Sequence, residues 1–410
     1  MGLNMFRLKG YPSNATHYFE IFFVVLVLLS QYIKVFYIAG FLYFFVAFLI
    51  LLTHKFIHLI KSSYLIFHVA IWLLLVSGFF AIKLISEEVD FWRIVVIARQ
   101  YFGWLVFYFY FSLRLRLIAG VKTQLRVAVI ILRYVLFVII SMCVVELFFH
   151  DLPIFSLIRD GFEFDRVYGI AARPSSTATI LVASSITLVL CSKRLYGAVH
   201  LFDKRLLYAA LGAFLTIQSG AGLVALLMAI VIFTFINSKK TFTKHRTRIV
   251  PLFFFMLVSV FVIFFAVNMV GFQDRLSMEY ITFLIDLKLN AVDTHARIDE
   301  FLIGVSESEY YDFGSDFAIF SMIGHVGVLG FILFVLISTS NSSLLNLPGL
   351  LIMIFSLLHY GAPFVSSGSI VFGIIASVGA ISLASPRVKH AVDIEIMKSP
   401  DHSQAGRMHV

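Results

Sequence analysis

The chain has 410 residues, of which 60% are hydrophobic and 13% charged, with a net charge of +9 and a mean hydropathy of +0.97. A soluble domain of this length needs far more polar surface, so the composition excludes the soluble classes and indicates a polytopic membrane protein. The first residues carry Arg7 and Lys9 but no small-residue cleavage site after a short apolar core. We therefore expect the first apolar segment to be kept as a span rather than removed as a signal peptide.

Apolar runs separated by polar breaks predict about twelve spans, each of roughly 20 residues. In chain order they lie at 18–33, 35–52, 64–85, 93–112, 127–149, 174–192, 205–219, 220–237, 249–270, 315–338, 344–360 and 364–384. Two pairs are fused runs, split at "QYIK" (31–34) and at "QSGAG" (218–222), where two glycines and a serine allow a tight turn. The expected fold class is an all-α polytopic integral membrane protein that forms a single domain over residues 1–410.

The distribution of basic residues predicts the orientation of these spans. If the N-terminus faces the cytoplasm, most of the 32 Lys and Arg residues fall in the loops and tails on that side, whereas the acidic residues gather on the other. The positive-inside rule expects this skew, so both termini, with the tail 385–410, should be cytoplasmic. The basic net charge then reflects topology, and nucleic-acid binding is not implied. Only two outward-facing loops are long, 150–173 and 271–314, and the second has the apolar spacing of short amphipathic helices.

The sequence gives little sign of metal or redox chemistry. Cys143 and Cys191 are the only cysteines, and both fall inside apolar runs. They indicate neither a disulfide framework nor a zinc site. No cluster of His, Asp and Glu has the spacing of a metal site, and no phosphate-binding glycine loop with a lysine is present. We therefore expect neither a metal nor a cofactor.

The two long outer loops carry arginines that can meet at one site. The first contains "EFDRVYGIAARPSSTAT" (163–179), with Arg166 and Arg173 just before an apolar span, and the second contains Arg275 and Arg297. The planar fork of arginine matches phosphate and pyrophosphate oxygens and stays charged when partly desolvated. Nucleotide triphosphates are absent from the outer leaflet. The pattern therefore predicts a site for a lipid-linked phosphate or pyrophosphate.

Two further arginines lie inside predicted spans. Arg99 is roughly 10 Å below the outer end of the fourth span at the helical rise. A cation at this depth needs a wet cavity or an anionic partner. Glu146, near the outer end of the fifth span, is the candidate partner, so Arg99 can join the outer arginines. Arg133 lies near the cytoplasmic end of the fifth span and is expected to snorkel to the interface.

Several of these candidates also have plainer explanations. Loop arginines beside acids are often surface pairs worth about 0–1 kcal/mol, and Asp316 in "GSD" can simply cap the tenth span. His295 can be a solvated loop histidine, and His325 inside a span is expected to serve packing or hydrogen bonding. Most aromatic residues supply lipid-facing and interhelical bulk, so sugar stacking is expected only at the outer face, for example from Tyr168 and Tyr310. The functional interpretation depends on the clustering of candidates on one face.

Three stretches resemble O-antigen polymerases and ligases. "DRVYGIAARPSSTATIL" (165–181) is similar to their Arg–x–x–Gly…Pro entry to a span, and "LTIQSGAGLVALLMAIVIF" (215–233) to a Thr–x–Ser–Arg–Gly start two spans later. The stretch 293–334 resembles their long outer loop, with an Arg, a following Gly, a polar pair and a Gly–x–x–Gly. The resemblance covers roughly 150–335, and the flanking spans add topology only.

The resemblance implies a metal-independent membrane glycosyltransferase with a GT-C-like fold in the bacterial inner membrane. Such an enzyme passes a growing glycan from its undecaprenyl pyrophosphate to the sugar end of another lipid-linked repeat. A chain-length regulator and a flippase are then the expected protein partners. Carried over by position, the residues that hold the pyrophosphate are Arg166, Arg297 and Arg275. The candidates for a general base on the acceptor hydroxyl are His295, Asp299 and Asp316.

One departure from the family pattern bears on the site. Where the family often has Ser–Arg at the start of the eighth span, this chain has Ser219–Gly220. The missing arginine must be replaced from elsewhere, and Arg173 and Arg99 are the candidates.

The leading hypothesis is a Wzy-type polymerase of a lipid-linked polysaccharide. A ligase that moves the finished polymer onto lipid A–core shares the fold and the pyrophosphate chemistry. His295, as a candidate base in the long outer loop, leaves this alternative hypothesis open. A transporter or flippase of lipid-linked sugars is the alternative from another class. Transporters usually place their charges near the midplane on broken helices within related halves. Here the charges gather at the outer face, and no internal repeat is evident.

Overall fold

The computed structural model describes residues 14–59, 63–85, 91–149, 167–171, 173–238, 279, 282, 318–358 and 361–381, without the side chains of some helix ends such as 91–99. Regular structure within these ranges is entirely helical. The helices are α1 (Asn14–Leu28), η2 (Leu29–Gln31), α2 (Lys34–Leu59), α3 (Ser63–Ile85), α4 (Phe91–Leu117), α5 (Val121–Phe148), α7 (Pro174–Tyr196), α8 (Leu201–Ile217), α9 (Gly220–Ser238), α14 (Ala318–Thr339), α15 (Leu347–Phe355), η6 (Ser356–Leu358), η7 (Ala362–Phe364) and α16 (Ser366–Val378). Each predicted apolar segment overlaps one of these helices, except 249–270, which lies outside the described residues.

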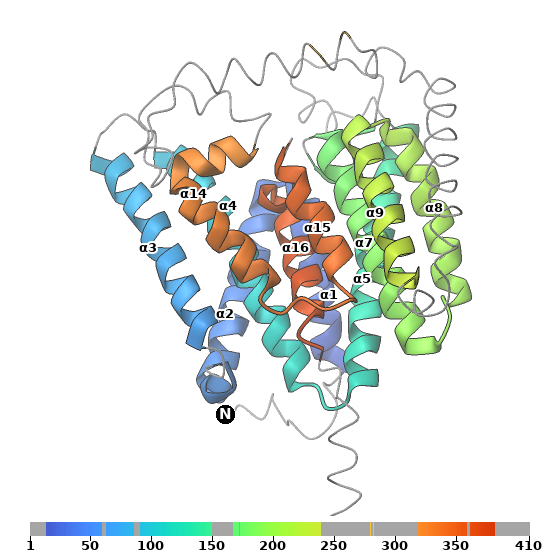
Figure 1. The fold of residues 1–410 in the computed structure, drawn as a ribbon, viewed down its shortest axis with the longest axis horizontal. Coiled ribbons are helices and arrows are strands. Elements are labelled where there is room, and N and C mark those ends of the chain that lie inside the picture. The colour runs from blue at the N-terminus through green and yellow to red at the C-terminus, as the bar shows by residue number, and fades with distance from the viewer. Residues whose placement is uncertain are drawn as a thin grey trace, which may run out of the picture.

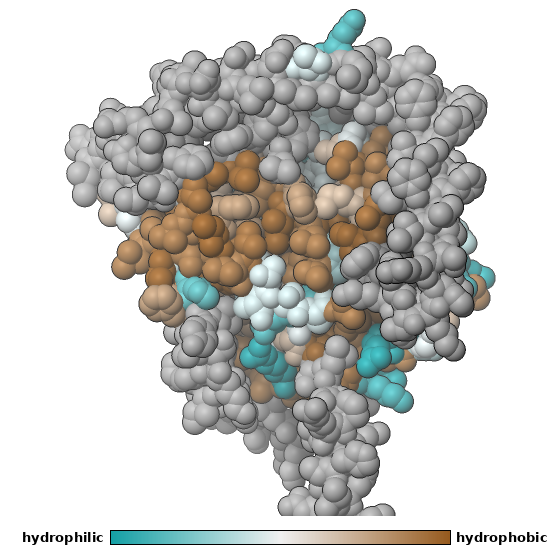
Figure 2. Space-filling view, viewed as in Figure 1, coloured by the Kyte–Doolittle hydropathy of each residue, from teal (hydrophilic) through white to brown (hydrophobic). Residues whose placement is uncertain are grey.

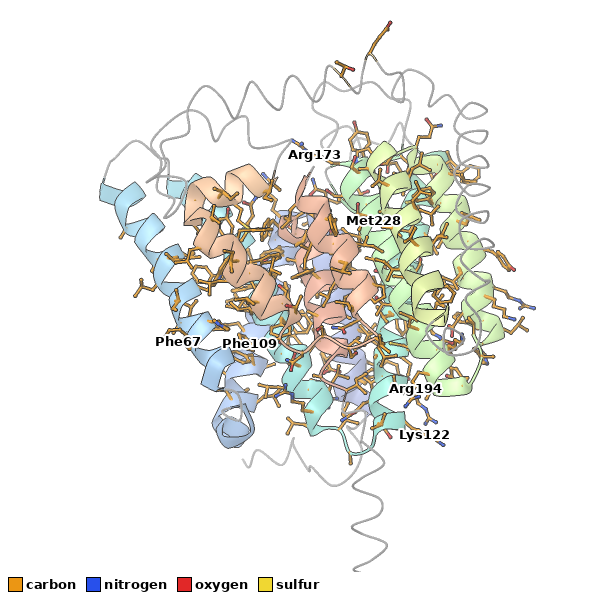
Figure 3. All side chains as sticks on the ribbon, in the orientation of Figure 1. Phe67, Phe109, Lys122, Arg173, Arg194 and Met228 are labelled. Carbon is orange, nitrogen blue, oxygen red and sulfur yellow. The ribbon has the colours of Figure 1, made fainter. Side chains whose placement is uncertain are left out.

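The helices run back and forth between two ends of a bundle (Figure 1). Arg173, just before α7, lies at one end, whereas Lys122 at the start of α5 and Arg194 near the end of α7 lie at the other (Figure 3). We call these the Arg173 end and the Lys122 end. The turns at 32–33 and 218–219 belong to the first, and those at 118–120 and 197–200 to the second.

Both predicted fused runs are divided where expected. The first breaks at Tyr32 and Ile33, between η2 and α2, and the second at Gln218 and Ser219, between α8 and α9. The residue that makes the second turn is not a glycine, however. Gln218 itself takes the left-handed conformation (φ 49°), whereas Gly220 and Gly222 both lie in α9.

Helix α7 lies in the interior, and small side chains let its neighbours approach closely. Nearly all of its residues from Pro174 to Ser192 are buried, and it packs against α5, α8, α9, α15 and α16. Many of these buried residues are Ser, Thr or Ala. Small residues of this kind are typical of helix contacts in membranes, where backbones gain van der Waals contact by coming close together. A Cβ on Gly222 of α9 would lie 2.6 Å from the Cβ of Ala178, so this contact needs glycine.

Gly222→Ala is expected to destabilise the bundle, because its methyl group overlaps Ala178 and lies 3.0 Å from the ring of Phe214. Overpacking of this kind costs about 1–3 kcal/mol. Gly212→Ala in α8 is the matched control, since nothing lies within 4 Å of a Cβ there and alanine favours helix by about 1 kcal/mol. Thermal unfolding in detergent should show a lower midpoint for Gly222→Ala and an unchanged or higher one for Gly212→Ala. Equal midpoints would contradict the close contact.

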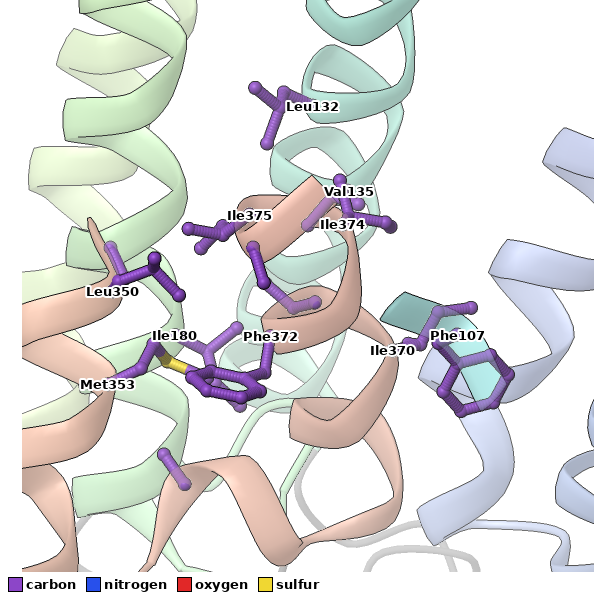
Figure 4. Close-up of a cluster of buried hydrophobic side chains, with 14 of the residues drawn as sticks. Phe107, Leu132, Val135, Ile180, Leu350, Met353, Ile370, Phe372, Ile374 and Ile375 are labelled. Atoms are coloured by element: carbon purple, nitrogen blue, oxygen red, sulfur yellow. The ribbon is translucent and has the colours of Figure 1, made fainter. Parts of the chain in front are cut away.

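Helix α16 occupies the centre of the hydrophobic core. Its contact with α4 is so close that a Cβ on Gly373 would lie 2.6 Å from the Cβ of Phe107 and 2.8 Å from the backbone nitrogen of Tyr108. Phe372 of the same helix is fully buried, in a cluster with Ile180 of α7 and Met353 of α15 (Figure 4). Helix α16, the last of the described helices, therefore joins the N-terminal helices to α7, and residues far apart in sequence form one core.

The outside of the bundle is apolar. Leu329, Ile332 and Leu336 of α14 are each more than 40% exposed, and a broad hydrophobic surface crosses the face shown in Figure 2. Among the described residues, three helices are long and apolar enough to cross a membrane, namely Lys34–Leu52 within α2, α5 and α7, and several shorter apolar helices accompany them. A bilayer favours an apolar outer surface and requires that the polar groups within the protein find partners there. The chain is a helical membrane protein, although these lengths do not establish the expected twelve spans.

Candidate functional site

A buried turn lies at the Arg173 end, between the first long predicted loop and α7. It comprises Val167–Ala171, all of whose side chains are buried. The backbone N–H of Val167 donates to the carbonyl oxygen of Thr216 in α8 at 3.4 Å. Loops usually lie on the surface, because buried backbone groups need partners. The turn is therefore a packed part of the bundle, and it leads directly to Arg173.

Glu146 of α5 supplies two of these partners. Its Oε2 accepts hydrogen bonds from the backbone N–H groups of Tyr168 (2.9 Å) and Gly169 (2.7 Å). The Glu146 side chain is 1% exposed. The structure thus gives Glu146 a backbone role at the turn that was not expected from the sequence. The side chain of Arg99, its predicted partner, is not among the described ones.

The conformation of Gly169 is possible only for glycine at this place. Its φ is +67°, in the left-handed region that residues with a side chain avoid. A Cβ would also lie 2.7 Å from Cγ2 of Thr177 and 3.1 Å from the sulfur of Cys143. This explains the glycine of the Arg–x–x–Gly motif in physical terms: the turn is left-handed and packed on both α5 and α7.

Two further side chains complete the hydrogen bonds of the turn. The hydroxyl of Thr177 donates to the carbonyl oxygen of Tyr168 at 2.5 Å and accepts from the N–H of Ala171 at 3.1 Å. The hydroxyl of Tyr32, from the turn before α2, donates to the carbonyl oxygen of Gly169. Nothing in the sequence marks Tyr32 or Thr177 as partners of this turn, since Tyr32 lies 137 positions away from Gly169.

Arg173 is the N-cap residue of α7, with extended backbone angles (φ −134°, ψ 131°) and proline directly after it. Its carbonyl oxygen accepts from the N–H groups of Ser176 (3.1 Å) and Thr177 (3.2 Å). The side chain is half-buried. A guanidinium at a helix N-terminus adds to the positive end of the helix dipole, so this place favours an anion.

Most other predicted site residues cannot be placed. His295, Asp299, Asp316, Arg166, Arg275 and Arg297 lie outside the described residues, and so does Tyr310. Arg99 lies in α4, but its side chain is not described. Of the predicted anion-binding arginines, the structure therefore positions the side chain of Arg173 alone.

The position of the missing family arginine is open. A Cβ on Gly220 would have nothing within 4 Å. Its neighbour Ser219 donates from its hydroxyl to that of Ser175, in the first turn of α7, at 3.2 Å. The start of α9 thus adjoins the start of α7 through Ser219. Tyr168 is only 7% exposed, so its ring is packed in the turn and the expected sugar stacking from it is wrong.

Helix α14 is broken at Gly327, whose angles are φ 72° and ψ 173°. Two residues earlier, Nδ1 of His325 lies 2.8 Å from the hydroxyl oxygen of Tyr101 in α4. The expected hydrogen-bonding role of His325 is confirmed. The sequence does not predict the break at Gly327, because a Gly–x–x–Gly pattern is equally compatible with a regular helix.

Two ion pairs lie toward the Lys122 end. Arg133 is bidentate on Asp203 of α8, with Nε–Oδ1 and Nη2–Oδ2 distances of 2.6 and 3.1 Å. The guanidinium thus has an anionic partner at this end of the bundle, while the Arg133 side chain is still 22% exposed. Its snorkelling to the interface stays a prediction. Glu20 of α1 likewise accepts from Nε of Arg114 at 2.7 Å and from the hydroxyl of Tyr110 at 2.5 Å. Both pairs join helices far apart in sequence, so we assign them a structural role in holding the helices together.

Among the described residues, no group of three or more His, Cys, Asp or Glu residues can hold a metal ion. Cys143 and Cys191 are both buried and free. Comparison with protein-family models, with curated proteins and with solved structures found no match to this chain. The case for a function therefore depends on the sequence motifs and on the geometry of the Arg173 end.

Proposed function

We propose that this protein polymerises undecaprenyl-pyrophosphate-linked oligosaccharide repeats at the periplasmic face of the bacterial inner membrane. The observation that carries the proposal is the turn before α7, which is locked by Glu146, Thr177 and Tyr32 and ends in Arg173. A membrane protein keeps a buried carboxylate and a half-buried arginine together at such a place only at considerable desolvation cost. The motif that resembles the polymerase family is the same stretch of chain.

The orientation follows from the charges at the two ends. Exposed basic residues gather at the Lys122 end, among them Lys122, Lys193 and Arg194. The positive-inside rule places this end in the cytoplasm, so the Arg173 end faces the periplasm, where lipid-linked repeats are joined. Both termini are then cytoplasmic.

The reaction needs no metal in this scheme. The acceptor hydroxyl attacks the anomeric carbon of the donor glycan, the bond from that carbon to the pyrophosphate oxygen breaks, and undecaprenyl pyrophosphate leaves with the negative charge. Arg173, with Arg166 and Arg297 from the outer loops, stabilises this leaving charge. The hydroxyl proton passes to a base, for which His295, Asp299 and Asp316 are the candidates.

A polysaccharide gel from cells lacking the protein, run beside the complemented strain, tests the proposal. We expect the ladder to disappear while a single repeat stays attached to lipid A–core, because unpolymerised repeats can still be ligated. Loss of all attached repeats with accumulation of lipid-linked polymer would instead indicate a ligase. An unchanged ladder would contradict both readings and leave transport of lipid-linked sugars as the function to examine.

A further inference from the structure

We infer that Glu146 is a positioning residue for the proposed reaction: through one hydrogen-bonding oxygen it holds the Val167–Ala171 turn and so fixes Arg173 against the lipid-linked pyrophosphate. This inference rests on the function proposed above. It concerns a residue of α5 that no motif of the resemblance contains.

The first step is the convergence of two N–H groups on a single atom. Both Tyr168 and Gly169 donate to Oε2 of Glu146. Two successive backbone N–H groups beside a left-handed residue form a nest, which is a binding geometry for anions and carbonyl oxygens. The turn therefore requires a hydrogen-bond acceptor at the position of Oε2, because the buried N–H groups of Tyr168 and Gly169 would otherwise lose this partner.

The second step runs from the turn to Arg173. The hydroxyl of Thr177 holds both Tyr168 and Ala171 of the turn, while the N–H of Thr177 donates to the carbonyl oxygen of Arg173. The chain on either side of Arg173 is therefore attached to the same turn of α7. If Glu146 is removed, the turn loses one of its supports and Arg173 loses its fixed backbone. A displacement of about 1 Å at such a residue can cost roughly 100-fold in rate.

Glu146 can be compared with two other buried carboxylates of the bundle, Asp203 and Glu20. Asp203 and Glu20 each accept from an arginine side chain of another helix, which suits a fastening between helices. Glu146 accepts two hydrogen bonds from the backbone of a turn. This contribution to the turn depends on an acceptor oxygen at the position of Oε2.

The test uses Glu146→Gln and Glu146→Ala in the full-length protein. The glutamine amide oxygen can accept both N–H groups without a charge, and alanine offers no acceptor. With polymer formed per unit of inserted protein as the measure, we expect Glu146→Gln to stay within about threefold of the parent and Glu146→Ala to fall more than about tenfold. Thr177→Val and Tyr32→Phe each remove a hydroxyl that hydrogen-bonds to the turn, with little change of side-chain shape. Each should reduce polymer formation.

Ser192→Ala at the Lys122 end is the matched control, because it also removes a hydrogen bond to a buried carboxylate, that of Asp203 at 2.6 Å. It should leave polymer formation per inserted protein unchanged.

Equal losses in Glu146→Gln and Glu146→Ala would overturn the inference and show that the charge is what matters. Full activity of Glu146→Ala would overturn it as well. If Glu146→Ala does not insert, Thr177→Val and Tyr32→Phe decide, and full activity of both contradicts the inference. A deletion strain with an unchanged ladder would instead remove the proposed function itself.

Discussion

Replacing Arg173 with alanine is expected to abolish polymer formation without preventing membrane insertion. Arg173 is the arginine of the proposed site whose side chain the structure places, half-buried at the N-terminus of α7. Its loss removes a charge that stabilises the departing pyrophosphate, an effect that typically amounts to about 100-fold to 1000-fold for one such donor. Arg173→Lys should recover only part of the activity, because an ammonium cannot make the bidentate contact of a guanidinium.

The measurement is the polysaccharide ladder together with the amount of inserted protein in each strain. Lys122→Ala and Arg194→Ala are the controls, since both residues are exposed at the opposite end of the bundle. They should give normal ladders. The same loss as in Arg173→Ala is expected for Arg166→Ala and Arg297→Ala, which the sequence assigns to the same site. Normal polymer from all three arginine variants would show that the proposed site is wrong.

Removing Asp203 is expected to produce the largest loss of stability of any single substitution considered. Asp203 is fully buried and bound by Arg133 and by the hydroxyl of Ser192. Asp203→Ala leaves the Arg133 guanidinium without its anion. Breaking a fully buried pair costs about 3–5 kcal/mol, and because the Arg133 side chain is 22% exposed, we expect a loss toward the lower end of this range. The midpoint of thermal unfolding in detergent should fall sharply. Ser192→Ala, which removes two neutral-donor hydrogen bonds but leaves the ion pair in place, should cost less, about 1–2 kcal/mol.

A double replacement separates a structural pair from a functional one. In Arg133→Met with Asp203→Leu, both charges are gone and the space is filled by apolar atoms, so most of the lost stability should return. Polymer formation per folded protein should return with it, because the pair lies toward the Lys122 end, away from the proposed site. A double variant that is as unstable as Asp203→Ala, or stable but inactive, would contradict the structural assignment of this pair.

The sequence predicted the parts of the structure that depend on local hydropathy. A helix of the bundle had to be a run of apolar residues, so the positions of α3, α5 and α7 and the breaks near Tyr32 and Gln218 could be read from the chain. The residues that form the turns were harder to predict. Gly220 and Gly222 suggest a turn, yet Gln218 forms it and Gly222 allows close helix packing. Local signals cannot separate these two uses of glycine.

Partner choice was decided by the tertiary structure alone. The pairing of Arg133 with Asp203 could not be predicted because the two residues lie 70 positions apart, and only the packing of α8 on α5 brings them together. The hydrogen bonds from the turn to Glu146 could not be predicted, since the donors are backbone N–H groups, which every residue except proline carries and no sequence pattern marks. The sequence by itself determined a bundle of apolar helices and an arginine before α7. The tertiary structure determined what holds that arginine, because a fixed turn depends on side chains from three separate parts of the chain.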